Sequence, residues 1–211
     1  MLKEMILVED VERYLYKLLP ERDEVLRQME VIAKKRNIPI VGPAVGRLLL
    51  QTARMVSAKR IFEMGSAIGY STIWLAHAVP LGGVVYYTDA STKNAEEADG
   101  YFQKAGVADR VKIMIGNALE LIDRVEGEFD LIFNDVDKHY YPQVFMKAAS
   151  RVRRGGILLA DNVLWSGRVA REEDDDATLA IREYNRLIYS APDFFTTIVP
   201  LRDGVAISYK L

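Results

Sequence analysis

Hydrophobic residues recur at helical spacing in the first part of the chain. Over residues 9–19 and 21–36, apolar side chains return every three or four positions among many charged ones, which predicts two amphipathic helices separated by Pro20. A third helix is expected from Pro43 to about Ser57, because a proline in the first turn loses no helical hydrogen bond. The chain therefore opens with helices.

From Arg60 onward, short apolar runs typical of strands alternate with helical segments. The strand-like runs are 61–64, 84–88, 111–115, 131–134 and 157–160, and the helical segments between them are 70–79, 92–105, 117–124 and 139–150. Repeated alternation of this kind predicts an α/β fold in which a parallel sheet is covered by helices on both faces.

The last part of the chain changes pattern again. A helix is expected over about 176–190, followed by strand-like runs at 194–199 and 205–209. Asp203-Gly204 between these two runs is typical of a hairpin, so the sheet should end in an antiparallel pair. The acidic stretch before the helix, residues 172–177, is expected to be a solvated loop.

No repeat, linker or low-complexity segment divides the chain. We therefore expect one domain over residues 1–211, with N-terminal helices in 1–57 and the sheet-containing core in 58–211. No run of about 18 apolar residues occurs, and residues 1–10 lack the long apolar core of a signal peptide. These features predict a cytoplasmic protein without a membrane partner.

Composition narrows the chemistry. The chain has 211 residues, of which 50% are hydrophobic and 27% charged, and it contains no cysteine and two histidines. Disulfides, thiolate metal ligands and a cysteine nucleophile are thereby excluded, and any metal should be held mainly by oxygen. The net charge of −2 gives no global attraction to nucleic acid or to anionic membrane.

Two strongly apolar runs each end on a carboxylate. Asp135 closes the run 130–135, and Asp161 closes the run 155–161 and is followed at once by Asn162. Two acids and an amide at strand ends are typical of an oxygen-ligand site for a hard divalent cation. Acids after strands also commonly cap the next helix, and that alternative stays open for each residue taken alone.

A glycine-containing turn follows the first predicted strand. Gly65 and Gly69 have G-x-x-x-G spacing, which differs from the G-x-G-x-x-G turn that places a helix N-terminus at a pyrophosphate, and the lysine of a phosphate-binding loop is missing. With the acid Glu63 before it, the turn suits a ligand that carries a positively charged amino-acid portion and no phosphate. A turn whose glycines serve only packing is the alternative.

Polar residues also end the next two predicted strands. Asp89 lies about 20 residues beyond Gly69, where an acid in a nucleoside-binding unit accepts hydrogen bonds from ribose hydroxyls. Asn117 and Ala118 follow the third strand, where they would flank an adenine ring. Either Asp89 or Asn117 could instead be a helix cap. Together the strand-end residues are stronger evidence for a binding site than any one of them, because the carboxyl ends of parallel strands share one crevice.

At these motifs the chain resembles the cation-dependent class I O-methyltransferases, which include catechol and caffeoyl-CoA O-methyltransferases. The resemblance covers about residues 38–211 and depends on residues 62–72, 133–138, 161–167 and 200–204. It implies a Rossmann-like class I methyltransferase fold with a seven-stranded, mostly parallel sheet and a C-terminal antiparallel hairpin. It also implies S-adenosylmethionine as cofactor and a divalent cation, Mg²⁺ first, with Mn²⁺ and Ca²⁺ as alternatives.

The resemblance assigns roles residue by residue. The implied cofactor-binding residues are Val41, Glu63, Gly65, Ser66, Ser71, Asp89, Ala118 and Asp135. The implied metal ligands are Asp135, Asp161 and Asn162. Lys138 matches the catalytic lysine, as a base with a pKa depressed by the cation or as a stabiliser of the acceptor oxyanion.

Residues near these motifs are open to more than one interpretation. His139 is expected at a helix start or in the pocket wall, and His77 is expected to be structural. Trp165 could line the acceptor pocket or the core, and Tyr140 and Tyr141 are undecided between pocket and packing.

Three functions remain open on the sequence. The first is methyl transfer to a hydroxyl of a small vicinal-dihydroxy aromatic, catechol-like or caffeoyl-like. The second is methylation of a wobble 5-hydroxyuridine of tRNA, for which the basic residues at 34–36, 151–154 and 168–171 would contact phosphates. The third is a non-catalytic nucleoside-binding or scaffold protein. The resemblance further implies a homodimer with the N-terminal helices near its interface or the acceptor pocket.

Departures from the family pattern affect the acceptor more than the site itself. Val45 stands where relatives often carry a charged residue, Asn117 where an acid is frequent, and His139 where plant members tend to have aspartate. These differences leave the predicted metal and cofactor residues intact and put the identity of the substrate in doubt.

Overall fold

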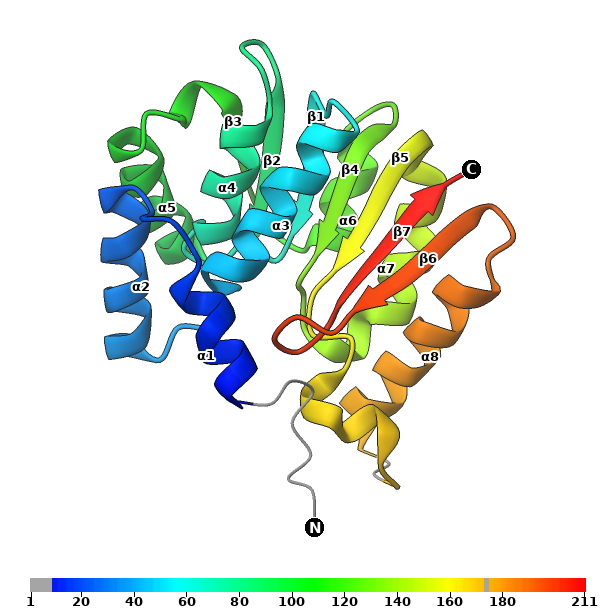
Figure 1. Ribbon diagram of the computed structural model, residues 1–211. Helices are drawn as coiled ribbons and strands as arrows, with labels where there is room; N and C mark the ends of the chain where they lie inside the picture. The colour runs from blue at the N-terminus through cyan, green and yellow to red at the C-terminus, as the bar shows by residue number, and fades with distance from the viewer. Residues whose placement is uncertain (1–8, 173–174) are drawn as a thin grey trace.

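The structure is a computed structural model that describes residues 9–172 and 175–211 (Figure 1). The expectations for residues 1–8, and for 173–174 of the acidic stretch, lie outside the described residues. The helices are α1 (Glu9–Lys17), α2 (Glu24–Arg36), α3 (Gly42–Met55), α4 (Tyr70–Ala78), α5 (Thr92–Lys104), α6 (Ala118–Leu121), α7 (Tyr141–Ala148) and α8 (Asp176–Ser190). The strands are β1 (Arg60–Met64), β2 (Val84–Asp89), β3 (Val111–Ile115), β4 (Phe129–Asn134), β5 (Val152–Ala160), β6 (Phe194–Val199) and β7 (Val205–Lys210).

Each predicted helix and strand is present, although several ends differ. The largest difference is in β5, which begins at Val152, five residues before the predicted run 157–160. The second helix begins at Glu24 because Asp23 is its N-cap, whose side chain accepts a hydrogen bond from the Leu26 amide. The third has Pro43 in its first turn, as expected. The segment expected to be helical over 139–150 begins as a 3₁₀ turn at Lys138 before α7, so the helix start carries the candidate catalytic lysine.

The strands form one sheet in the order β3-β2-β1-β4-β5-β7-β6. Neighbouring strands pair in parallel along the series β3, β2, β1, β4 and β5. Strand β7 pairs antiparallel with β5 on one side and with β6 on the other. The seven-stranded, mostly parallel sheet with its C-terminal antiparallel hairpin is thereby confirmed. Because β7 follows β6 along the chain yet lies next to β5, the hairpin folds back into the sheet.

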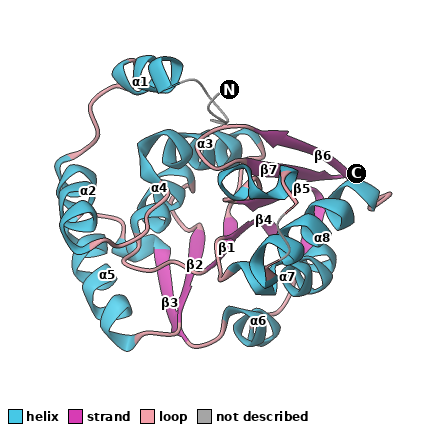
Figure 2. Cartoon of the chain, turned by 90° about the horizontal axis from the view of Figure 1, so that it is seen from below, coloured by secondary structure: helices cyan, strands magenta, loops and turns pink. Residues whose placement is uncertain are grey.

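Helices cover both faces of the sheet (Figure 2). Alternate strand residues divide between the two faces. Ile61 and Leu131 pack in one buried cluster, with residues of α2, α3, α4 and α5. Phe62 and Ile132 pack in the other, with residues of α6, α7 and α8. This division follows from the two-residue period of a strand, which sends successive side chains to opposite faces.

Helix α1 differs from the others because its nine residues include no buried one. Its residues Val11, Tyr14 and Leu15 are exposed, as is Leu18 directly after it, whereas Tyr16 is partly buried. Within the described part of the chain, no helix is long and apolar enough to cross a bilayer.

Candidate active site

Strand register brings the two strand-end acids together. Asn134 of β4 pairs with Ala160 of β5, so the next residues, Asp135 and Asp161, lie side by side at the carboxyl end of the sheet. The backbone continues the pattern, since the Asp161 amide donates to the Asn134 carbonyl at 3.1 Å and the Asp135 amide to the Met64 carbonyl at 2.9 Å. The two acids that the sequence places far apart thus form a pair.

The paired acids are held where a negative charge is costly. Asp161 is buried, and its Oδ1 atom has no hydrogen-bond partner. Burial and then the nearby Asp135 carboxylate raise the pKa of Asp161 to about 7. Burial also raises the pKa of Asp135, although the Lys138 ammonium opposes the shift. A positive charge between these carboxylates would stabilise the ionised form of both.

Lys138 lies against the acid pair. Its Nζ atom donates to Asp135 Oδ1 at 2.8 Å, to the Val136 carbonyl at 3.3 Å and to the Tyr141 hydroxyl at 3.0 Å. The Tyr141 hydroxyl in turn donates to the Asp161 carbonyl at 2.7 Å. Tyr141, undecided in the sequence, is a fully buried link between the lysine and the second acid.

The loop after β5 is fixed by the β6–β7 turn. The amides of Val163 and Leu164 donate to the carbonyls of Gly204 and Asp203 at 3.1 and 2.9 Å. Asn162 has a positive φ of 56°, which residues other than glycine adopt at a cost. Burial raises the pKa of Asp203, and the neighbouring Asn162 side chain is among the groups that lower it. Asp203 therefore lies beside the amide that the sequence predicts as a cation ligand.

The glycine turn after β1 approaches the strand-end acids closely. A Cβ atom on Gly65, whose φ is +84°, would lie 2.6 Å from the carbonyl oxygen of Asp135, so only glycine fits there. Before this turn, Glu63 is fully buried, accepts a hydrogen bond from the Thr72 hydroxyl and leaves Oε1 without a partner. Burial raises the pKa of Glu63 to about 7, while the hydroxyls of Ser71, Thr72 and Ser66 lower it.

Asp89 holds the loops at the end of β2. One of its carboxylate oxygens accepts the Ala67 amide at 3.0 Å, and the other accepts the Ser91 amide at 2.8 Å and the Asn94 side chain at 3.1 Å. Ser91 caps α5, so Asp89 is not itself the cap. Asn117 does cap α6, and its side chain accepts the Leu119 amide at 2.9 Å.

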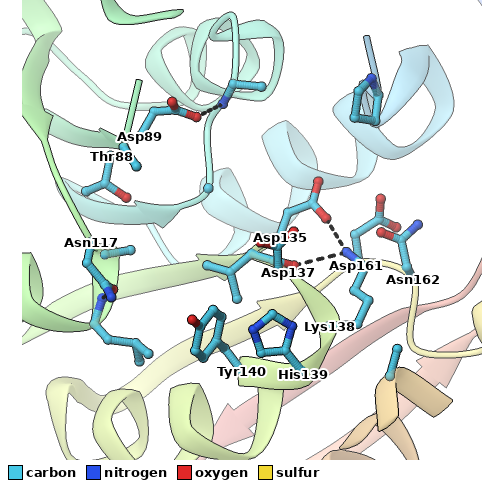
Figure 3. Close-up of a pocket in the computed structure, with 18 of the residues that line it drawn as sticks. Thr88, Asp89, Asn117, Asp135, Asp137, Lys138, His139, Tyr140, Asp161 and Asn162 are labelled. Atoms are coloured by element: carbon cyan, nitrogen blue, oxygen red, sulfur yellow. Dashed lines mark hydrogen bonds and ion pairs between the residues drawn. The ribbon is translucent and has the colours of Figure 1, made fainter. Parts of the chain in front are cut away.

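One cavity of about 950 Å³ runs along these strand ends. Figure 3 shows Asp89 and Asn117 on one side of it, and Asp135, Lys138, Asp161 and Asn162 on another. Its wall also includes Gly65, Ala118, His139, Tyr140 and Trp165. The volume suits a nucleoside-sized cofactor together with a small acceptor.

Not every predicted site residue reaches this cavity. The predicted site residues that are buried and are not among its lining residues are Val41, Glu63, Ser66 and Ser71. Conversely, Pro39, Thr88 and Arg202 line the cavity without having been assigned a role. A motif predicts which residues lie at strand ends, whereas a cavity-wall role depends on which loops the fold brings together, as for Pro39 and Arg202.

Comparisons with known proteins agree with this geometry. The family model described as O-methyltransferase matches residues 18–211. A catechol O-methyltransferase of Niastella koreensis is 31% identical, with 95% of this chain and 96% of that protein covered. A catechol O-methyltransferase of Mycobacterium tuberculosis is 32% identical, with 90% of this chain and 88% of that protein covered.

A solved structure shares the fold and holds the demethylated cofactor. The O-methyltransferase of Bacillus cereus in complex with S-adenosylhomocysteine has a TM-score of 0.86 and 30% identity, with 96% of this chain and 97% of that one covered. The sheet topology together with this likeness gives the chain the fold of a class I methyltransferase. The chain belongs to the O-methyltransferase family and is an S-adenosylmethionine-dependent O-methyltransferase.

Proposed function

We propose that the protein methylates one hydroxyl of a small vicinal-dihydroxy aromatic and that it needs a divalent cation to do so. The observation that carries the proposal is the convergence of Asp135, Asp161, Asn162 and Lys138 at one end of the cavity, opposite Asp89. Methyl transfer from a sulfonium is an in-line displacement, so donor and acceptor oxygen must be aligned. The acid pair and the lysine lie where that oxygen would be.

The residues at this end fit a hard divalent cation, Mg²⁺ first. They offer carboxylate and amide oxygens, and Asp161 has a buried oxygen that no protein group satisfies. In the described residues, no three His, Cys, Asp or Glu side chains gather as a metal cluster, so the proposed set depends on the amide of Asn162 as third ligand. When bound, such an ion lowers the pKa of a hydroxyl that it contacts and fixes two neighbouring oxygens.

Lys138 is proposed to act on the acceptor oxygen. Three oxygens accept from its Nζ atom, which matches the three N–H donors of an ammonium group. The charged form would stabilise the acceptor as an oxyanion, whereas a neutral form would take its proton. Exchange of one of these protein acceptors for the acceptor oxygen requires little movement, because Val136 is the weakest of the three at 3.3 Å.

We predict that Lys138→Ala lowers turnover by roughly 10²–10⁴-fold, the range for losing a general base or an oxyanion stabiliser, with little change in cofactor affinity. Lys138→Arg separates the two roles, because arginine keeps the charge but does not act as a base. Substantial activity in the arginine variant favours stabilisation, and activity as low as in the alanine variant favours the base. Near-normal turnover of Lys138→Ala would rule out both.

The acceptor is identified by a methyl-transfer screen with labelled S-adenosylmethionine. Catechols, caffeoyl thioesters and tRNA lacking the wobble modification are compared with Mg²⁺ and with excess chelator. Mg²⁺-dependent labelling of a catechol or caffeoyl acceptor is expected, and Asp135→Ala should abolish both turnover and metal dependence. Full turnover in excess chelator would contradict the proposed cation dependence. Labelling of tRNA alone would contradict the proposed small-molecule acceptor.

Several basic residues considered for tRNA have internal partners. Arg151 donates to the carbonyls of Ile122, Val125 and Gly127, and Arg153 donates to Asp130. Arg36 pairs with Glu97. These contacts favour a small acceptor over a phosphate backbone.

The proposal includes a homodimer. Its support is the exposed apolar side of α1, which the described part of the protein does not cover. Contiguous exposed apolar surface commonly marks a protein interface.

A further inference from the structure

Arg202, in the β6–β7 turn, contacts a segment far from it in sequence. Its Nη1 atom donates to the Ile40 carbonyl at 3.0 Å and also to the Val41 carbonyl. These residues belong to the stretch 39–42, here called the strap, which comprises the end of the connection from α2 to α3 and the first residue of α3, Gly42. One guanidinium thus connects the last hairpin of the sheet to the N-terminal helices.

The strap forms part of the cavity wall. Pro39 and Ile40 line the same cavity as Gly65 and Asp89, two residues implied to bind the cofactor. The stretch ends at Gly42, where φ is +71°. Displacement of the strap would therefore open this cavity.

The end of the strap is enclosed by two side chains. A Cβ atom on Gly42 would lie 3.7 Å from Arg202 Nη1 and 3.8 Å from the Tyr16 hydroxyl. Tyr16 belongs to α1, and burial raises its pKa while the Arg202 charge lowers it. The strap thus lies between the β6–β7 turn and the first helix.

Arg202 adopts a backbone conformation that favours glycine. Its φ is +52°, which costs a residue with a Cβ atom of the order of 1 kcal/mol. Residues held in such conformations concentrate at ligand clamps and active sites, where surrounding contacts maintain them. Burial raises the pKa of Asp135, Asp161 and Asp203, and the positive charge of Arg202 opposes the rise in each. Arg202 therefore holds the strap by hydrogen bonds and acts on the acid pair through its charge.

We propose that Arg202 is a positioning residue that holds the strap closed over bound S-adenosylmethionine by binding the carbonyls of Ile40 and Val41. It acts through the strap and slows release of the cofactor. The inference uses the cofactor that the family binds and is independent of the cation and acceptor proposed above. A failure of either proposal leaves this one to be judged by cofactor binding alone.

Arg202→Gly is the decisive variant. Glycine adopts φ of +52° without penalty, so the substitution removes the guanidinium and relaxes the backbone. We expect a Tm within a few degrees of wild type, because relief of the backbone strain offsets part of the lost hydrogen bonding. Binding of S-adenosylmethionine should be about tenfold weaker, the loss expected for one charge-assisted hydrogen-bond donor. The change should lie mainly in the dissociation rate, measured by chasing labelled cofactor. Amide hydrogen exchange should become faster in residues 39–46 and stay unchanged in the central strands.

Two further variants complete the test. Ser57→Gly is the matched control, because exposed Ser57 also has a positive φ, of 51°, yet follows α3 away from the strap contacts. It should leave cofactor affinity unchanged. Arg202→Lys keeps a charged donor and should recover most of the affinity lost in the glycine variant.

Two outcomes would overturn the proposal. One is wild-type cofactor affinity and strap exchange in Arg202→Gly. The other is a Tm lowered by several degrees with faster exchange throughout the sheet, because Arg202 would then stabilise the fold in general. If the glycine variant does not fold, Arg202→Asn takes its place, because asparagine tolerates a positive φ and lacks the charged guanidinium. Wild-type dissociation and exchange in that variant would count against the strap.

Discussion

Several acidic residues in this site are buried, where an ionised carboxylate is less stable than it is in water. Glu63 is completely buried with one oxygen unpartnered, and the pair of Asp135 and Asp161 combines burial with like charge. A buried carboxylate is tolerated when a ligand supplies the missing positive charge. The cofactor carries a positive amino group and a positive sulfur, so we expect its binding to raise the stability of the protein, most of all where these carboxylates are ionised.

The buried acid at Glu63 predicts a pH dependence of stability. Its pKa is raised from 4.5 to about 7, so between these values the unfolded chain loses the proton while the folded protein keeps it. Stability without cofactor should therefore fall as pH rises through this window and level off above about 7. Glu63→Gln lacks the group, and its free energy of unfolding should exceed that of wild type by a margin that grows across the window to roughly 3 kcal/mol.

Urea unfolding at several pH values between 4.5 and 8 measures this margin. Asp161 titrates in the same range and is present in both proteins, so its contribution cancels in the difference. Wild-type and variant curves that run parallel would show that Glu63 does not keep its proton in the folded protein.

At the scale of elements, the close approach of α3 to α4 depends on one glycine. A Cβ atom on Gly46 would lie 2.3 Å from the indole nitrogen of Trp74, a distance that no real contact shows. Alanine normally favours a helix over glycine by about 1 kcal/mol. Here steric overlap should outweigh that gain, because overfilling a packed interface costs typically 1–3 kcal/mol.

Gly46→Ala should accordingly lower the free energy of unfolding by about 1–2 kcal/mol. Gly100, in the middle of α5, has no atom within 4 Å of its Cβ position and provides the matched control. Gly100→Ala should raise stability by about 0.5–1 kcal/mol. Chemical denaturation of both variants gives the comparison, and an equal gain in both would mean that α3 and α4 separate easily.

The sequence predicts elements well and contacts between distant elements poorly. Periodicity locates all the strands, and the motif at Asp161 and Asn162 marks the site, because these signals are local. The insertion of β7 beside β5 and the bond from Arg202 to Ile40 depend on residues far apart in the chain. Tyr141 could not be assigned either, since a buried tyrosine and a pocket tyrosine have the same local pattern.

For the whole molecule, the exposed apolar side of α1 predicts self-association. Leu15→Glu combined with Leu18→Glu should convert a dimer to a monomer, because charges at the centre of an apolar contact are strongly unfavourable. Met146→Glu on α7, where Met146 is 71% exposed, is the control and should leave the dimer intact. Sedimentation velocity distinguishes the species, and a wild-type protein that is monomeric at tens of micromolar would contradict the prediction.

The position of β7 also has a consequence for how the chain acquires its site. Synthesis proceeds from the N-terminus, so β5 must wait with an open edge until residues 205–210 have emerged and can be inserted beside it. The same hairpin supplies the carbonyls that fix the loop after Asn162. The half of the crevice near Asp89 can therefore form on a nascent chain before the half near Asp161. A chain stalled on the ribosome before residue 205 would be an incomplete enzyme whose unpaired β5 edge is prone to aggregation.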